Sequence, residues 1–246
     1  MNEIAAVILA LNEQKQIKEC IASVRWTHRV VVFDTYSADE TVPRALSAGA
    51  EVMQHRFENY AQIRNAALEA VQSDWVFFID ADERATPALA AEIREVTASR
   101  PENGWWVPRH NYLFGKLTLS AGWYPDYQMR LIRRGKGVYD RPVHEVVILT
   151  GDAGYLQNPL LHYNYETVAE FHAKQARYSD YDAERLHSEG LRPRAYSPAT
   201  QFLHHFYWRF INLHGYRDRT HGLRLCLLTA WYEAITYQKL RRLWAD

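Results

Sequence analysis

The sequence predicts an α/β fold with a mostly parallel central sheet flanked by helices, followed by a C-terminal helical extension. Short apolar runs alternate with amphipathic helical patterns over the first hundred residues, and one of these runs, Trp75–Ile79, is apolar throughout. Helical patterns fill the chain from residue 165 onward. The length of 246 residues suits one α/β domain with a short extension better than two full domains.

Each element of the first hundred residues follows from its local pattern. The apolar run Ile4–Ala10 predicts the first strand, and apolar residues at helical spacing over residues 17–24 predict a helix after it. The elements expected next are a strand at Val30–Phe33, a helix at Thr41–Ala48, a strand at Glu51–Gln54, a helix at Tyr60–Val71, a strand at Trp75–Ile79, and a helix capped by Thr86 with Pro87 at its first position. Strands separated by helices predict a parallel sheet, with loops converging at the carboxyl ends of the strands.

The sequence pattern changes after residue 100, where Trp, Tyr, Arg and Gly become frequent. It predicts strands at Trp105–Pro108, Gln128–Arg133 and Val146–Leu149, and then three helices at Val168–Glu189, Ser197–Leu213 and Gly222–Leu243. Thr167 and Glu170 form a capping box for the first of these helices. We therefore expect a catalytic domain over residues 1–164, with halves at 1–100 and 101–164, and a helical extension over residues 165–246.

The formal net charge is zero, but it is unevenly distributed. Residues 192–246 hold nine basic and three acidic side chains, so this segment carries +6 and residues 1–191 carry −6. The same segment is rich in Trp, Tyr and Phe, and basic helices with aromatic faces are typical of membrane-interfacial helices. Alternatively, the rings pack against the sheet domain or form a dimer contact. The balanced total charge and the lack of a recognition motif argue against nucleic acid as a partner.

The ends and the cysteines bear on localisation. The N-terminus lacks the features of a signal peptide, and Cys20 and Cys226 are far apart, so we expect no disulfide framework or zinc site. These features favour the cytoplasm, with the basic tail on the inner face of the cytoplasmic membrane. The sequence does not indicate the oligomeric state.

Polar clusters follow three of the predicted strands. They are Asn12-Glu13, the segment 34–39 beginning at Asp34, and Asp80-Ala81-Asp82. Two carboxylates separated by one residue at the end of a strand suit Mg²⁺ or Mn²⁺, which in turn binds the phosphates of a nucleotide. The alternative is that Asp80 and Asp82 cap a turn, and that Asp34 makes Asx-turn bonds within its loop.

The whole pattern resembles the nucleotide-diphospho-sugar transferases of glycosyltransferase family 2, which have the GT-A fold, and among them the bacterial enzymes of lipopolysaccharide core synthesis. The segments that carry the resemblance are 7–13, 31–41, Gln62 to Asn65, 77–83, 122–126 with Arg130-Leu131, and Val143-His144-Glu145. The segment 31–41 departs from the usual pattern at Tyr36 and Glu40, where small residues are commoner.

The resemblance implies a role for each of these residues. Leu11, Asn12, Glu13, Asp34, Arg64, Asp80, Ala81 and Asp82 are expected to bind the UDP-sugar, with Asp80, Asp82 and His144 as ligands of a divalent metal. Asp126 is the first candidate for the base that deprotonates the acceptor hydroxyl, and Glu145 is the second. Trp123, Tyr124 and Arg130 are expected to bind the acceptor.

The expected function is an inverting, metal-dependent transfer of a hexose from a UDP-sugar to a glycolipid or polysaccharide-precursor acceptor, in lipopolysaccharide or cell-envelope glycan biosynthesis. Two alternatives are a non-catalytic sugar-nucleotide-binding scaffold at the membrane surface and an Mg²⁺-dependent phosphohydrolase. The phosphohydrolase would need a Thr soon after its Asp-x-Asp motif, whereas Glu83-Arg84 follows here.

Overall fold

The computed structural model describes residues 2–140 and 146–245. The chain forms two compact units. Unit 1 comprises Met1–Arg109 and Tyr127–His162, and unit 2 comprises His110–Asp126 and Tyr163–Asp246. The expected boundary at residue 164 lies close to the last passage between the units, but residues 110–126 also belong with the C-terminal helices.

Unit 1 contains most of the strands. They are β1 Ile4–Ala10, β2 Arg29–Asp34, β3 Glu51–Gln54, β4 Trp75–Asp80, β5 Glu83–Ala85, β8 Tyr127–Arg133, β9 Gly137–Asp140, β10 Val146–Leu149 and β11 Ala153–Tyr155. Two strands, β6 Gly104–Leu113 and β12 Leu160–Tyr165, begin in unit 1 and continue into unit 2. Of the seven strands expected from the sequence, six are confirmed within one residue at each end, and the seventh, β6, is longer than expected.

The central sheet of unit 1 is parallel through β3-β2-β1-β4 and antiparallel beyond β4, through β8 to β6. Val7 of β1 pairs with Val31 on one side and with Phe78 on the other, so β1 is central and its side chains are buried on both faces. The polar residues after β1, β2 and β4 consequently meet at one edge of the sheet, as the sequence predicts.

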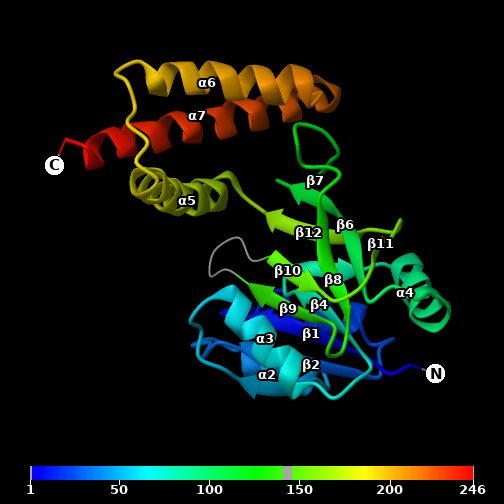
Figure 1. The fold of residues 1–246 in the computed structure, drawn as a ribbon. Helices are drawn as coiled ribbons and strands as arrows, with labels where there is room; N and C mark the ends of the chain where they lie inside the picture. The colour runs from blue at the N-terminus through cyan, green and yellow to red at the C-terminus, as the bar shows by residue number, and fades with distance from the viewer. Residues whose placement is uncertain (1, 141–145, 246) are drawn as a thin grey trace. The chain divides into compact units, whose positions relative to one another are not determined.

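Helices cover both faces of this sheet. They are α1 Ile17–Ser23, α2 Thr41–Ser47, α3 Tyr60–Ala70 and α4 Pro87–Ser99. Alternate residues of β1 point to opposite sides: Ile8 packs with Ile17 of α1 and Leu89 of α4, whereas Val7 packs with Ile63 of α3. Figure 1 shows α3 and α4 on opposite sides of the sheet. Thr86 caps α4 as expected, since its hydroxyl accepts a hydrogen bond from Leu89 N.

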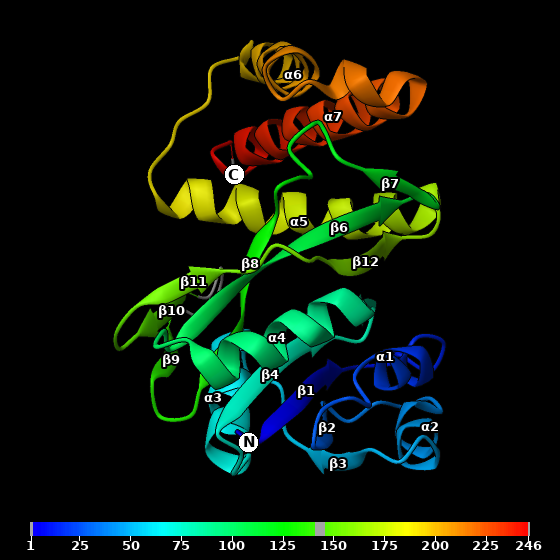
Figure 2. The same cartoon turned by 90° about the vertical axis from the view of Figure 1, so that its right-hand side faces the viewer.

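Unit 2 is mainly helical. It contains β7 Lys116–Thr118, α5 Val168–Ser188, α6 Ser197–Tyr207, a π-helical segment Trp208–Asn212, a short 3₁₀ helix Gly215–Asp218 and α7 Arg219–Leu243. The predicted capping box is present at α5. Helices α6 and α7 lie side by side (Figures 1 and 2). A Cβ atom on Gly222 would lie 1.9 Å from Gly215 O, so the start of α7 requires glycine there.

Residues 110–126 are bound to the C-terminal helices within unit 2. Ser120 Oγ donates to Asp218 Oδ2 at 2.5 Å, and Ala121 N donates to Leu213 O at 2.8 Å. Thr118 Oγ1 lies 3.0 Å from His221 Nε2. The core of this unit is aromatic, and Phe171 of α5 and Tyr232 of α7 are buried in it. Part of the aromatic excess of the tail therefore belongs to internal packing.

The two cysteines, Cys20 and Cys226, are free and buried. Burial raises the pKa of the Cys226 thiol to about 11 and that of Cys20 well above its ordinary value. No helix in the described part of the chain combines the length and the apolar character that crossing a membrane requires.

Candidate functional site

The loops after β1 and β2 are tied to each other by hydrogen bonds. Asn12 adopts a positive φ of 57°, its N–H donates to Ser37 Oγ at 2.8 Å, and its Oδ1 accepts from Ala38 N at 2.9 Å. Glu13 N donates to Thr41 Oγ1 at 2.8 Å. Asn12 therefore braces the loop edge, while Leu11 beside it is 52% exposed.

Asp34 lies at the end of β2 and is fully buried. Its Oδ2 accepts hydrogen bonds from Ser37 N at 3.0 Å and from Gln54 Nε2 at 3.4 Å. Its Oδ1 is also buried, and within residues 2–140 and 146–245 no donor reaches it. Buried carboxylate oxygens are normally hydrogen-bonded, so this atom is an acceptor whose capacity the described residues leave unmet. The alternative of Asx-turn hydrogen bonds within the loop accounts for Oδ2 of Asp34 and leaves Oδ1 unexplained.

A buried ion-pair cluster surrounds Asp80 and Glu83 at the end of β4. Arg130 of β8 binds Asp80 through two contacts of 2.5 and 3.2 Å and binds Glu83 Oε1 at 2.7 Å. Arg64 of α3 lies 3.3 Å from Asp80 Oδ1, and Arg109 of β6 lies 3.2 Å from Glu83 Oε1. Glu83 also accepts a hydrogen bond from Asp80 N at 2.9 Å, so both carboxylates hold the turn in one conformation.

The arginines of this cluster determine the charge state of Asp80. Burial acts to raise the pKa of the Asp80 carboxyl, but the guanidinium groups of Arg130 and Arg64 outweigh it and hold that pKa well below its ordinary value. Burial acts to lower the pKa of Arg130, and Asp80 and Glu83 reverse that effect. The carboxylate of Asp80 is consequently ionised, and its oxygens are engaged by two arginines.

Asp82 has a different environment from that of Asp80. Its Oδ2 lies 3.4 Å from Nε2 of His162 on β12, and its side chain is 24% exposed. Ala81 between the two aspartates is buried, and its carbonyl accepts a hydrogen bond from Arg84. A carboxylate and an imidazole are both common metal-ligand types, so the pair Asp82 and His162 fits one side of a divalent-metal site. The described residues contain no cluster of three or more His, Cys, Asp or Glu side chains that could hold a metal.

The candidate base and the candidate acceptor residues Trp123 and Tyr124 belong to unit 2. Asn111, itself 1% exposed, donates through Nδ2 to Asp126 Oδ2 at 3.0 Å and to Trp123 O at 2.8 Å. Tyr124 is 38% exposed and lies edge-on to His110. Trp123 is partly buried and packs edge-on against Tyr165, so much of its ring serves the core of the unit. The other two predicted site residues, His144 and Glu145, lie outside the described residues.

Sequence reasoning did not identify three residues that contact the predicted site residues or each other in unit 1. They are Glu83, Arg109 and His162. Glu83 was recognised only as part of a motif, although an acidic residue directly after Asp-x-Asp could have been considered as an anchor for arginine. His162 contacts Asp82 across 80 positions of sequence, and β12 itself was not predicted. Only the alternation of Leu160 and His162, both buried, hinted at a strand.

Comparisons with known proteins agree on one family. A sequence model described as "Glycosyl transferase family 2" matches residues 5–133. Lipopolysaccharide core biosynthesis glycosyltransferase LpsC of Rhizobium meliloti is 33% identical over 244 residues, covering 92% of this chain and 90% of that protein. An uncharacterized glycosyltransferase of Rickettsia bellii is 25% identical and covers 98% of this chain and 87% of its own length.

A solved structure also has a similar fold. Glucosyl-3-phosphoglycerate synthase from Mycobacterium tuberculosis, in complex with Mn²⁺, UDP and glucosyl-3-phosphoglycerate, matches with a TM-score of 0.50 and 18% identity. The match covers 79% of this chain and 82% of that chain. The GT-A fold expected from the sequence is confirmed.

Replacement of Arg130 by Met should strongly destabilise the protein. The Arg130→Met variant leaves Glu83 and Asp80 with one fewer guanidinium each, and breaking a buried ion pair on one side costs about 3–5 kcal/mol. Urea unfolding measures this loss. The matched control is Arg29→Met, which breaks the exposed pair with Glu51 and should cost no more than about 1 kcal/mol. Equal losses in the two variants would contradict the assignment of the cluster as a stabilising core.

Proposed function

Because the chain belongs to glycosyl transferase family 2 and is a glycosyltransferase, we propose that it transfers a hexose from a UDP-sugar, with inversion, to a glycolipid or polysaccharide-precursor acceptor of lipopolysaccharide or cell-envelope glycan synthesis. Family membership favours this function over the phosphohydrolase and scaffold alternatives. The name of the Rhizobium relative supports the class of acceptor, and the complex of the Mycobacterium enzyme supports UDP and a divalent metal.

The observation that carries the donor assignment is the buried Asp34 Oδ1, for which the described residues provide no hydrogen-bond donor. The uracil N–H and the ribose hydroxyls are donors that could complete it. Asp34 ends β2, and the strand order β2-β1-β4 separates it from Asp80 by one strand. A nucleoside lying across the carboxyl ends of these strands would reach from Asp34 to the Asp80-Ala81-Asp82 turn.

Asp82 and His162 are the described residues that best fit a divalent metal. Asp80 is held by Arg130 and Arg64, so in this proposal it supports the turn and the ribose more than the ion. His144, the third expected ligand, lies outside the described residues. When bound, the metal supplies positive charge that stabilises the leaving diphosphate.

Asp126 is the proposed base. The acceptor hydroxyl attacks the anomeric carbon, a new C–O bond forms there, the bond from that carbon to the diphosphate oxygen breaks, and the hydroxyl proton passes to the Asp126 carboxylate. The amide of Asn111 orients Asp126 by its hydrogen bond to Oδ2. Glu145 remains the second candidate for this role.

The C-terminal helices are proposed to bind an anionic membrane surface. Two exposed apolar stripes at four-residue spacing support this proposal: Leu203, Tyr207 and Ile211 on α6 and the following π-helical segment, and Leu223, Leu227 and Trp231 on α7. Basic side chains of residues 192–246 supply the attraction to anionic lipid, apart from Arg209, which binds Ala121 O, and Lys239, which pairs with Asp180. An enzyme attached to such a surface would lie where a lipid-linked acceptor is located.

Replacement of Asp82 by Asn should remove the Mn²⁺-dependent part of UDP-sugar binding and leave the fold intact, because a neutral amide is a much weaker metal ligand. His162→Ala should weaken Mn²⁺-dependent binding in the same direction. Titration calorimetry with and without Mn²⁺ measures both effects, with Glu69→Gln on the exposed face of α3 as the control. Unchanged affinity of Asp82→Asn in Mn²⁺ would refute the metal assignment.

Replacement of Asp126 by Asn should preserve UDP-sugar affinity and reduce the transfer rate by on the order of 10²–10⁴-fold, the usual contribution of a general base. The measurement is UDP release in the presence of acceptor. Glu184→Gln on the exposed surface of α5 removes a carboxylate from the same unit and should keep full activity. If the Asp126→Asn variant still transfers the sugar at the wild-type rate, Asp126 is not the base and Glu145 becomes the candidate.

Vesicle binding tests the membrane proposal. The protein should sediment with anionic liposomes at low salt and be released as salt rises, because exposed charges are screened. Leu227→Glu should weaken this binding, whereas Leu46→Glu, at an exposed leucine of α2 in unit 1, should not. A protein that ignores anionic liposomes at low salt would rule out the attachment.

A further inference from the structure

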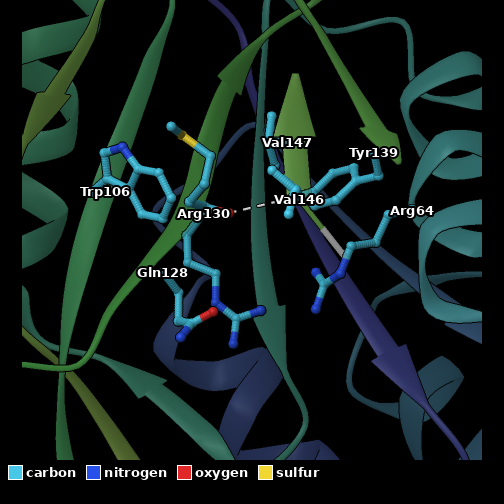
Figure 3. Close-up of a pocket in the computed structure, with 8 residues that line it drawn as sticks. Arg64, Trp106, Gln128, Arg130, Tyr139, Val146 and Val147 are labelled. Carbon is cyan, nitrogen blue, oxygen red and sulfur yellow. Dashed lines mark hydrogen bonds between the residues drawn. The ribbon is translucent and has the colours of Figure 1, made fainter. Parts of the chain in front are cut away.

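Unit 1 and unit 2 each contain a cavity. The cavity of unit 1, of about 320 Å³, is lined in part by Arg64 and Arg130, which bind Asp80, so it belongs to the candidate functional site (Figure 3). The cavity of unit 2 has a volume of about 250 Å³ and is lined by Arg192, Pro193, Arg241 and Trp244. It combines two guanidinium groups with an indole, where the end of α7 lies beside the segment that joins α5 to α6 (Figure 1).

The indole of Trp244 forms a wall of this cavity that is already in position. Trp244 Nε1 donates a hydrogen bond to Leu191 O at 2.8 Å, which ties the end of α7 to the chain that follows α5. The guanidinium carbon of Arg192 lies 4.5 Å from the centre of the indole ring, and the centres of the His187 and Trp244 rings are 4.5 Å apart. A ligand would therefore meet a site that needs little ordering when it binds.

The second arginine of the cavity, Arg241, is held by the backbone between α5 and α6. Its Nη1 donates to Ala195 O at 3.2 Å. The backbone around Ala195 is itself fixed, because Ser197 N donates to Arg194 O at 3.0 Å and Arg194 N donates to Ser197 Oγ at 2.9 Å. The two lining arginines thus come from two segments of unit 2 that are bonded to each other.

Both lining arginines retain hydrogen-bond donors for a ligand. The N–H groups of an arginine lie around the edge of its planar guanidinium group. Arg192 contacts Trp244 through the flat face of that group, and in the described part of the chain none of its N–H groups donates to an acceptor. Among the same residues, Arg241 donates only to Ala195 O. Both arginine side chains are exposed, so a ligand can reach their remaining donors.

The position of a counter-ion beside these arginines is not taken by a described carboxylate. Glu189, the acidic residue nearest to Arg192 in the sequence, binds Arg185 Nη1 at 2.8 Å. Within residues 2–140 and 146–245, no carboxylate lies within ion-pair distance of Arg192 or Arg241. Arginine binds phosphate groups through paired N–H donors, so the cavity has the charge and the donors of a phosphate site.

Exposed apolar side chains lie next to the cavity residues in the chain. Leu191 is 39% exposed and precedes Arg192, and Leu243 is 37% exposed and precedes Trp244. A phosphate that is free in water would gain nothing from these leucines, whereas the acyl chains of a lipid would contact them. Tryptophan and arginine are also common where a protein meets the headgroups of a membrane. These surroundings favour a lipid headgroup over a soluble phosphate.

We propose that this cavity binds the phosphomonoester headgroup of a membrane lipid. A phosphomonoester carries a charge of about −1.5 to −2 at neutral pH, so it matches two guanidinium groups better than a singly charged phosphodiester does. The inference rests on the proposed membrane attachment, to which it adds the recognition of one kind of headgroup.

Vesicles that contain two different anionic lipids test the proposal. Phosphatidylcholine vesicles are prepared with either phosphatidate, a phosphomonoester, or phosphatidylglycerol, a phosphodiester, in amounts that give equal surface potential. The wild-type protein should bind the phosphatidate vesicles on the order of tenfold more tightly, because one additional hydrogen bond between charged groups contributes about that factor. The double variant Arg192→Gln/Arg241→Gln should bind both kinds of vesicle equally.

The matched control is the double variant Arg217→Gln/Arg219→Gln. It removes two exposed arginines of the same unit that do not line the cavity. It should weaken binding to both kinds of vesicle by the same factor, through the loss of general electrostatic attraction, and keep the preference for phosphatidate. Thermal unfolding of both double variants checks that they fold like the wild-type protein.

Soluble probes separate a lipid headgroup from a free phosphate. Monomeric dihexanoyl phosphatidate and glycerol 3-phosphate share the phosphomonoester and differ in the acyl chains. Tighter binding of dihexanoyl phosphatidate by the wild-type protein, lost in Arg192→Gln/Arg241→Gln, would support a lipid. Equal affinity for the two probes would assign the cavity to a soluble phosphate and overturn the proposal.

Equal binding of the wild-type protein to the two kinds of vesicle would overturn this inference alone and leave the proposed membrane attachment in place. A preference for phosphatidate that persists in Arg192→Gln/Arg241→Gln would likewise overturn only the inference. Binding to neither kind of vesicle at low salt would overturn both. The affinity for UDP in Mn²⁺, measured on the same samples, tests the proposed transferase function separately.

Discussion

The structure of unit 1 depends on one interaction, the ion pairing of Asp80 and Glu83 with arginines from three other elements. A parallel strand that ends in carboxylates needs positive partners once its surroundings are buried. Arg64 comes from α3, Arg109 from β6 and Arg130 from β8, so the cluster joins the first hundred residues of the chain to the strands that follow them. The turn is thereby fixed with Asp82 on its outer side, beside His162.

Much of the fold could be predicted because the apolar pattern of the first hundred residues is determined by burial. Strand β1 is covered on both faces, and its residues are apolar almost without interruption. Strands β5, β7, β9 and β11 have only three or four residues, without the helix on each side that revealed β3 or the apolar run that revealed β10. Strand β12 buries a polar residue, His162, which hides its apolar face. The last helical turns after α6 were expected as continuous α-helix, but Trp208–Asn212 widens into a π-helical segment.

Candidate site residues could be proposed from sequence where they lie at strand ends, and less readily where their position depends on packing. Asp34 and Asp80 were proposed because they end buried parallel strands, at the edge of the sheet where ligands bind in such folds. The arginine partners of Asp80 and Glu83 could not be found in this way, since Arg109 and Arg130 are distant in sequence and arginine is common on surfaces. Trp123 was proposed as an acceptor residue because it lies beside a glycine in a loop, but a tryptophan in that position can equally face the core. Its contact with Tyr165 shows that much of the ring packs within its own unit.

The construction of unit 2 from two chain segments has a consequence for modularity. Within the segment 110–126, Thr118, Ser120 and Ala121 bind Leu213, Asp218 and His221. The C-terminal helices are thus not an independent tail that recombination could attach to any catalytic domain. A chimaera that exchanged only residues 163–246 between relatives would lose the partners of Thr118, Ser120 and Ala121. Inheritance of these helices is therefore linked to inheritance of a loop almost a hundred residues upstream, which carries the candidate base Asp126.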